Sequence, residues 1–237
     1  LRALHLEGHA LISQHRFTDA EKVLNSLVSK APNSFVPLFN LGVCQLNQAE
    51  KGVDKAIVNF EKARKIQPSH PGVPYNLGII HRFKGEEAAA LAEFKTALEL
   101  APRDSDCHYQ VAIGLLRTGQ QELALPHFEM AVQLDPTIRG AWNNLQLMWR
   151  RSGRIEEANK ALATFEALDK SGQGRAHSTK YTEQGKISEA IRDWAEPELS
   201  RASATPKPGS EFSEEPIDQA DSGDPNAPMA LVDSDLD

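Results

Sequence analysis

The stretch FKTALELAPRD, Phe94 to Asp104, occurs in two further versions along the chain with the same spacing of its key residues. It recurs as FEKARKIQPSH, Phe60 to His70, and as FEMAVQLDPTI, Phe128 to Ile138. Each copy has an aromatic residue, an alanine three residues later and a proline five residues after that. Repetition of one pattern at a fixed interval is typical of a protein built from stacked repeats.

The interval stays close to 34 residues through the first 170 positions. A ladder of alanines has successive spacings of 36, 34, 34 and 34 residues, and prolines and small residues elsewhere follow the same period. The ladder consists of Ala20, Ala56, Ala90, Ala124 and Ala158. A unit of this length is too small to bury its own apolar face, so the pattern predicts that neighbouring units stack.

Each unit is predicted to form two helices. In the third unit, Leu77 and Ile80 have helical spacing, and Gly85 then supplies the residue that permits a left-handed helix end. A second apolar stripe that includes Phe94 continues until Pro102, which cannot extend a helix. The sequence therefore predicts a row of helical hairpins.

These residues resemble the tetratricopeptide repeat family, whose second helix follows the pattern Ala-x3-Phe-x2-Ala-x4-Pro. Ala90, Phe94, Ala97 and Pro102 match it in full, and Leu77-Gly78 matches the first helix. The resemblance implies an all-α fold, a right-handed α-solenoid of antiparallel helix pairs. Five repeats are expected to cover residues 1–168, at about 1–34, 35–70, 71–104, 105–138 and 139–170.

The next segment, KYTEQGKISEAIRDW at 180–194, carries a weaker version of the pattern. Its matching positions are Tyr181, Gly185, Ile187, Ala190 and Trp194. Terminal repeats of a solenoid are atypical because one face meets water. We therefore expect residues 171–198 to form a degenerate sixth repeat or a capping helix.

Residues 199–237 are rich in Pro, Ser, Asp and Glu and are predicted to be a disordered acidic linker or tail. The chain has 20 basic and 19 acidic residues up to Lys170 but 6 and 14 after it, so the net charge of -7 belongs to the C-terminal part. Without a basic stripe or a long apolar run, neither nucleic acid nor membrane insertion is predicted. Further domains beyond Asp237 are compatible with a linker. The chain begins at Leu1 without a methionine, which leaves a signal peptide and the compartment open.

No motif for catalysis, for a cofactor or for phosphate binding is present, and we predict that the chain is not an enzyme. His5 and His9 lie one helical turn apart, but they lack the glutamate and the third ligand of a zinc site. Cys44 and Cys107 have no metal or redox spacing and are expected to be buried small side chains. The sequence therefore directs attention to a binding surface.

In the tetratricopeptide repeat family the first helices line a concave groove, and the resemblance places the fifth, sixth and ninth positions of each helix on it. A primary amide offers both a donor and an acceptor, so a row of amides can pair with the main chain of an extended peptide. The alternative is that these asparagines support the fold and that the ninth-position residues pack between helices. The predicted peptide-binding residues are the amides Asn40, Asn76, Gln110 and Asn144 with the apolar Phe39, Tyr75, Tyr109 and Ile113.

The resulting hypothesis is a non-enzymatic scaffold that binds an extended segment of a protein or peptide in this groove. Two alternatives stay open: a recruiting arm of a larger enzyme such as a glycosyltransferase, and the repeat segment of a bacterial multidomain protein that continues into an FG-GAP β-propeller with an ASPIC/UnbV segment. A carboxylate clamp, by which some members of the family hold acidic C-termini, is not predicted, because only Asn40 matches its five positions.

Overall fold

The computed structural model describes residues 1–48, 50–177 and 183–194. The chain divides into two units, Leu1–Ala204 and Thr205–Asp237, and every described residue belongs to the first. The linker or tail predicted at 199–237 therefore lies outside the described residues, as does Tyr181.

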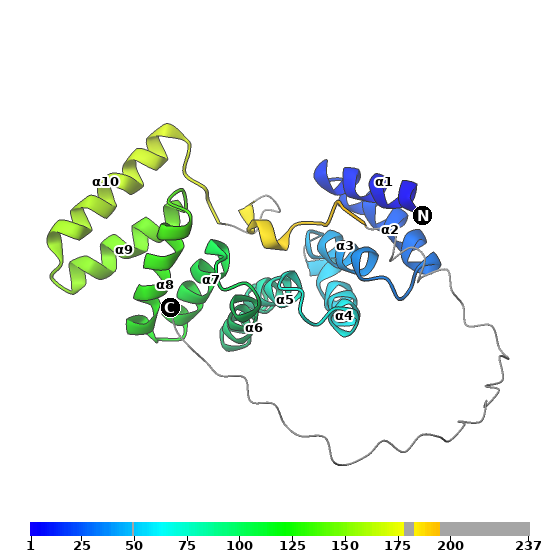
Figure 1. Ribbon diagram of the computed structural model, residues 1–237, viewed down its shortest axis with the longest axis horizontal. Helices are drawn as coiled ribbons and strands as arrows, with labels where there is room; N and C mark the ends of the chain where they lie inside the picture. The colour runs from blue at the N-terminus through cyan, green and yellow to red at the C-terminus, as the bar shows by residue number, and fades with distance from the viewer. Residues whose placement is uncertain (49, 178–182, 195–237) are drawn as a thin grey trace, which may run out of the picture. The chain divides into compact units, whose positions relative to one another are not determined.

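The described residues contain ten α-helices, which pack as five hairpins (Figure 1). Each second helix also packs against the first helix of the next hairpin. The prediction of an all-α solenoid of antiparallel helix pairs is confirmed. The first helices are α1 (Arg2–Ser13), α3 (Phe35–Leu46), α5 (Gly72–Phe83), α7 (Ser105–Arg117) and α9 (Arg139–Arg151). The second helices are α2 (Phe17–Lys30), α4 (Glu50–Ile66), α6 (Glu87–Leu100), α8 (Gln121–Leu134) and α10 (Ile155–Ser171).

Small residues set the distance between the two helices of a hairpin. All five alanines of the ladder have no exposed surface. At Gly78 an added Cβ would lie 2.8 Å from the ring of Phe94, which is itself fully buried. A side chain cannot be accommodated at that distance, so the small residue on the first helix makes room for the aromatic residue on the second.

Glycines end the first helices of the last three hairpins. Gly85, Gly119 and Gly153 have φ angles of 77°, 78° and 79°. Residues with a Cβ rarely adopt this left-handed conformation, so glycine is the residue that permits such a short turn. The turn directs each second helix back along its partner.

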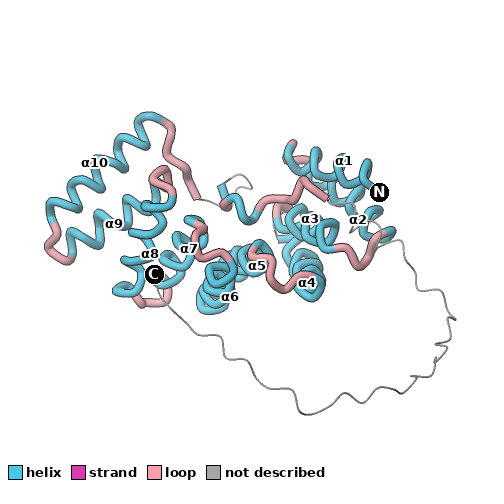
Figure 2. Tube along the Cα trace, in the orientation of Figure 1, coloured by secondary structure: helices cyan, strands magenta, loops and turns pink. Residues whose placement is uncertain are grey.

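The segment after α10 corrects the expectation for residues 171–198. Gly172 ends α10 in the left-handed region, with a φ of 66°. The described part that follows, 172–177 and 183–194, contains no α-helix; its 3-10 helix η2 (Lys186–Ser188) is followed by loop (Figure 2). Gly185 has a φ of 107° and a ψ of 147°, which no helix contains. The predicted sixth repeat or capping helix is therefore not formed by these residues.

Candidate functional site: an extended segment on the inner face

The first helices of the hairpins form one face of the solenoid, which we call the inner face. Residues 183–194, which we call the inner segment, run along this face from α7 and α5 to α3 and α1 (Figure 1). The direction of the segment is opposite to the order of the repeats. The hydrogen bonds that join main-chain groups of the inner segment to side chains of the inner face include six described below.

Asn40 on α3 makes two of these hydrogen bonds with one residue. Its Nδ2 donates to the carbonyl oxygen of Ile191 at 2.8 Å, and its Oδ1 accepts from the amide nitrogen of Ile191 at 2.7 Å. The asparagine is fully buried. It therefore contacts an extended chain as a neighbouring β-strand would, through one donor and one acceptor, without reading the side chain of Ile191.

Asn76 on α5 divides its donor between its own helix and the inner segment. Its Nδ2 donates to the carbonyl oxygen of Gly72 at 2.8 Å and to that of Ser188 at 3.3 Å. Its Oδ1 is buried and has no partner among the described residues. The same residue type thus makes a weaker contact here than at Asn40.

Tyr75 on α5 holds the beginning of the segment. Its hydroxyl donates to the carbonyl oxygen of Gln184 at 2.7 Å and accepts from Nε2 of Gln110 at 3.2 Å. Burial, followed by the nearby carboxylate of Asp106, raises the pKa of Tyr75 well above its ordinary value, which keeps the proton on the hydroxyl. An added Cβ at Gly185 would lie 2.6 Å from this hydroxyl, so only glycine permits the close approach.

Asp106, in the first turn of α7, is the most connected side chain of the site. Its Oδ2 accepts from the amide nitrogen of Lys186 at 3.2 Å. Its Oδ1 accepts from Nε2 of His177 at 2.7 Å and from Nη1 of Arg175. Burial alone would raise the pKa of Asp106, but the hydrogen bond and charge of His177 and the charge of Arg175 outweigh burial and lower it. The carboxylate therefore stays ionised and organises three donors.

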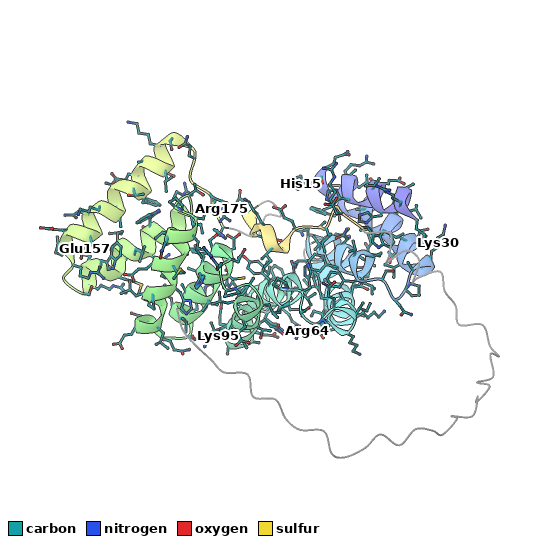
Figure 3. The ribbon with its side chains drawn as sticks, in the orientation of Figure 1. His15, Lys30, Arg64, Lys95, Glu157 and Arg175 are labelled. Atoms are coloured by element: carbon teal, nitrogen blue, oxygen red, sulfur yellow. The ribbon has the colours of Figure 1, made fainter. Side chains whose placement is uncertain are left out.

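Arg175 connects this cluster to the end of the solenoid and lies beside α7 in Figure 3. Its Nη2 donates to Oδ2 of Asp135 at 2.7 Å, and its amide nitrogen donates to the carbonyl oxygen of Thr137 at 2.7 Å. Its carbonyl oxygen accepts from the amide nitrogen of Arg139 at 3.3 Å. The main chain and the side chain of Arg175 together hold the segment after α10 against the end of the solenoid and against Asp106, which binds the start of the inner segment.

The far end of the inner segment lies on α1. Nε2 of His5 donates to the carbonyl oxygen of Arg192 at 2.7 Å, and the His5 ring meets the edge of the Trp194 ring at a centroid distance of 5.2 Å. Trp194 is buried against the apolar core of the first hairpins. His5, a fifth-position residue, thus contacts the main chain of the inner segment.

The two other predicted amides do not contact the main chain of the inner segment by any hydrogen bond described. Gln110 supports the site from behind, because its Nε2 donates to the Tyr75 hydroxyl and its Oε1 accepts from Arg82. Asn144 on α9 donates to the carbonyl oxygen of Gly140, in its own helix, at 2.8 Å.

The apolar residues predicted for the groove have different surroundings. Phe39 is fully buried, with its ring 5.6 Å from that of Phe60, so it belongs to the core. The ring of Tyr109 lies over that of His177 at a centroid distance of 4.4 Å. Ile113 is half-buried and lines a cavity of about 550 Å³ beside the inner segment.

Sequence reasoning missed Asp106, Arg175 and His177. An acidic residue in the first turn of a helix is usual, because it complements the helix dipole, so Asp106 has no distinguishing local pattern. Arg175 and His177 lie 69 and 71 residues from Asp106 in the chain. The only available signal was the polar stretch after Lys170, which lacks the apolar periodicity of a helix.

The buried cysteines have no reactive arrangement. Burial raises the pKa of the Cys44 thiol to about 12 and raises that of Cys107 further, so both stay protonated. In the part of the chain that the structure describes, no group of three or more His, Cys, Asp or Glu side chains is placed to hold a metal ion. What the site can do chemically is pair with a main chain.

Comparison with known proteins agrees with this architecture. Residues 75–138 match the family profile described as tetratricopeptide repeat. Residues 75–138 are therefore similar to tetratricopeptide repeats, and the five hairpins share the fold of such repeats. No curated protein sequence matches it.

Several solved structures share the fold. A crystal structure of MamA is 19% identical and superposes with a TM-score of 0.60 over 70% of this chain and 95% of that one. MamA 41-end from Desulfovibrio magneticus RS-1 is 20% identical, with a TM-score of 0.61 over 72% and 96%. YrrB, described as a TPR protein with an unusual peptide-binding site, is 21% identical, with a TM-score of 0.55 over 62% and 75%. At these identities the likeness concerns the fold.

Proposed function

We propose that this tetratricopeptide repeat chain is a non-enzymatic scaffold that binds an extended segment of a partner protein on its inner face. The observation that carries the proposal is the pair of hydrogen bonds between Asn40 and the main chain of Ile191. Those bonds use groups that every peptide has, so the inner face can accept other extended segments in the same way.

The inner segment defines the geometry that a partner would reproduce. The six main-chain hydrogen bonds described above contribute about 1 kcal/mol each, which gives about 6 kcal/mol before other contacts and costs. Apolar contacts such as that of Trp194 add to this sum. Within the described residues, no helix has the length and apolar composition to cross a membrane.

A partner segment has to replace the inner segment, which is tethered to the same chain. A short tether keeps a competing segment at an effective concentration on the order of millimolar. The proposed site is therefore one in which the apparent affinity for a partner is low until the inner segment is displaced.

The test uses the full chain with its inner segment weakened. In the released variant, Gly185→Ala places a Cβ against the Tyr75 hydroxyl, and Ile191→Pro removes the N–H that Asn40 accepts. A fluorescent peptide, EQGKISEAIRDW, supplies residues 183–194 in trans. Circular dichroism checks that the variant keeps its helices.

We expect this peptide to bind the released variant at least about tenfold more tightly than the unaltered chain, by fluorescence anisotropy. Adding Asn40→Ala should abolish that binding, whereas Asn25→Ala, on the exposed side of α2, should not change it. Equal binding to the released variant and the unaltered chain, or binding that ignores Asn40→Ala, would refute the proposed function.

A further inference from the structure

A cavity of about 550 Å³ lies beside Gln184, where α3, α4, α5 and α7 meet the inner segment. Its apolar walls include Ile79, Phe83 and Ile113. Its polar lining includes Arg82 and Arg117. The cavity thus combines a low-dielectric wall with two guanidinium groups.

Arg82 has no anionic hydrogen-bond partner among the described residues. Its guanidinium lies over the ring of Phe94 at 4.6 Å, and its terminal nitrogens donate to the side-chain and main-chain oxygens of Gln110. Its Nε is buried without a hydrogen-bond partner in the same part of the chain. No Asp or Glu side chain described by the structure lies within 4 Å of it as an ion pair. Arg82 is half-buried, and a cation that is partly removed from water is usually paired, so Arg82 is an exception that calls for a ligand.

Other arginines of the protein show what the missing partner would supply. Arg64 donates from Nη2 to both carboxylate oxygens of Glu93 at 2.9 Å. Arg117, which shares the cavity with Arg82, donates to Glu87. Carboxylates therefore satisfy arginines elsewhere on the solenoid, and Arg82 differs from them in donating to neutral acceptors.

The charges around the cavity favour an anion. No Asp or Glu lines it among the described residues. Asp106, on the neighbouring α7, is already bound by Arg175 and His177. Burial, followed by the proximity of Arg117, lowers the pKa of Arg82, although an arginine stays charged at every physiological pH. A further carboxylate beside Arg82 would offset the charge of Arg117, as that of Glu87 already does in part.

We infer that this cavity binds the carboxylate of an Asp or Glu side chain in the partner segment, with Arg82 as its principal donor. The inference rests on the proposed function, because it takes the partner to follow the path of the inner segment. Gln184 already lines the cavity from that path, where its Nε2 donates to Oδ1 of Asn47, so a glutamate at the same place in a partner would bring a carboxylate into the cavity that Arg82 lines. Arg82 and Arg117 both lie outside the five positions of the carboxylate clamp.

The first experiment compares two fluorescent peptides on the released variant. EQGKISEAIRDW has the native glutamine, and EEGKISEAIRDW carries a glutamate at the place of Gln184. We expect the glutamate peptide to bind about tenfold more tightly, because a charge-assisted hydrogen bond in a desolvated site is stronger than a neutral one. The advantage should disappear with Arg82→Gln and survive Arg151→Gln, which removes the same charge from the exposed end of α9.

The outcomes separate the two proposals. If both peptides bind the released variant equally, the carboxylate site is refuted and the proposed function stands. If neither peptide binds, the proposed function fails. The carboxylate site is then tested by a substitution within the chain itself. For that arm, Gln184→Glu is introduced into the full chain, alone and together with Arg82→Gln. If the carboxylate site exists, Gln184→Glu raises the melting temperature more in the chain that keeps Arg82 than in the chain that carries Arg82→Gln. Equal changes in the two chains would overturn the carboxylate site.

Discussion

Asn40 and Asn144 occupy the same place in two repeats, yet they have different partners. Asn40 makes two hydrogen bonds to Ile191, whereas Asn144 donates to Gly140 within its own helix. Asn76, between them, donates to both kinds of partner. The comparison shows that a repeat position supplies a side chain capable of either role, and that the segment facing it decides which role is realised.

The largest effect should come from Asp106, which fixes the start of the inner segment. Asp106→Ala removes the acceptor of Arg175, His177 and Lys186, and breaking a buried ion pair in this way costs about 3 to 5 kcal/mol. Urea unfolding would measure the loss of unfolding free energy. Asp169→Ala, which breaks an exposed pair with Arg139, should cost less than about 1 kcal/mol. Equal losses would show that the Asp106 cluster contributes no more than a surface ion pair.

A smaller effect should separate the two asparagines. Asn40→Ala leaves the amide and carbonyl of Ile191 without their partners, which should cost about 2 to 3 kcal/mol. Asn144→Ala should cost less than about 1 kcal/mol, because it removes one hydrogen bond within a helix. Urea denaturation of the two variants side by side is the measurement. A loss at Asn144 as large as that at Asn40 would break the comparison.

The smallest effect should appear on acidification. The folded-state pKa of Asp106 is lowered, so its contribution is present above the ordinary aspartate pKa of about 3.9 and is lost as the pH falls through the folded value. The stability difference between the native chain and Asp106→Asn should therefore be constant near neutral pH and shrink below about pH 4. Thermal melts from pH 3 to pH 7 would measure it. A difference that does not change with pH would contradict the assignment of an ionised Asp106.

The sequence predicted the fold because the fold depends on local and periodic features. The alanines of the ladder, such as Ala90 and Ala124, are all fully buried. The glycines that end the first helices of the last three hairpins adopt the left-handed conformation that such turns require. The occupied inner face could not be predicted in this way. Gly185, Ile187 and Trp194 have the spacing of a repeat, yet Gly185 adopts a conformation outside the helix and the segment finds its partners on α1, α3, α5 and α7. Those contacts span up to 187 residues, and no local pattern encodes them.

The most direct test of the account is hydrogen exchange at the amide of Ile191, because that single group reports whether the inner face holds an extended main chain. In the native chain the amide should exchange at least about tenfold more slowly than in the isolated peptide EQGKISEAIRDW, since Asn40 accepts its hydrogen at 2.7 Å. Asn40→Ala should remove that protection and Asn144→Ala should preserve it. Exchange at the rate of the isolated peptide in the native chain would contradict the account.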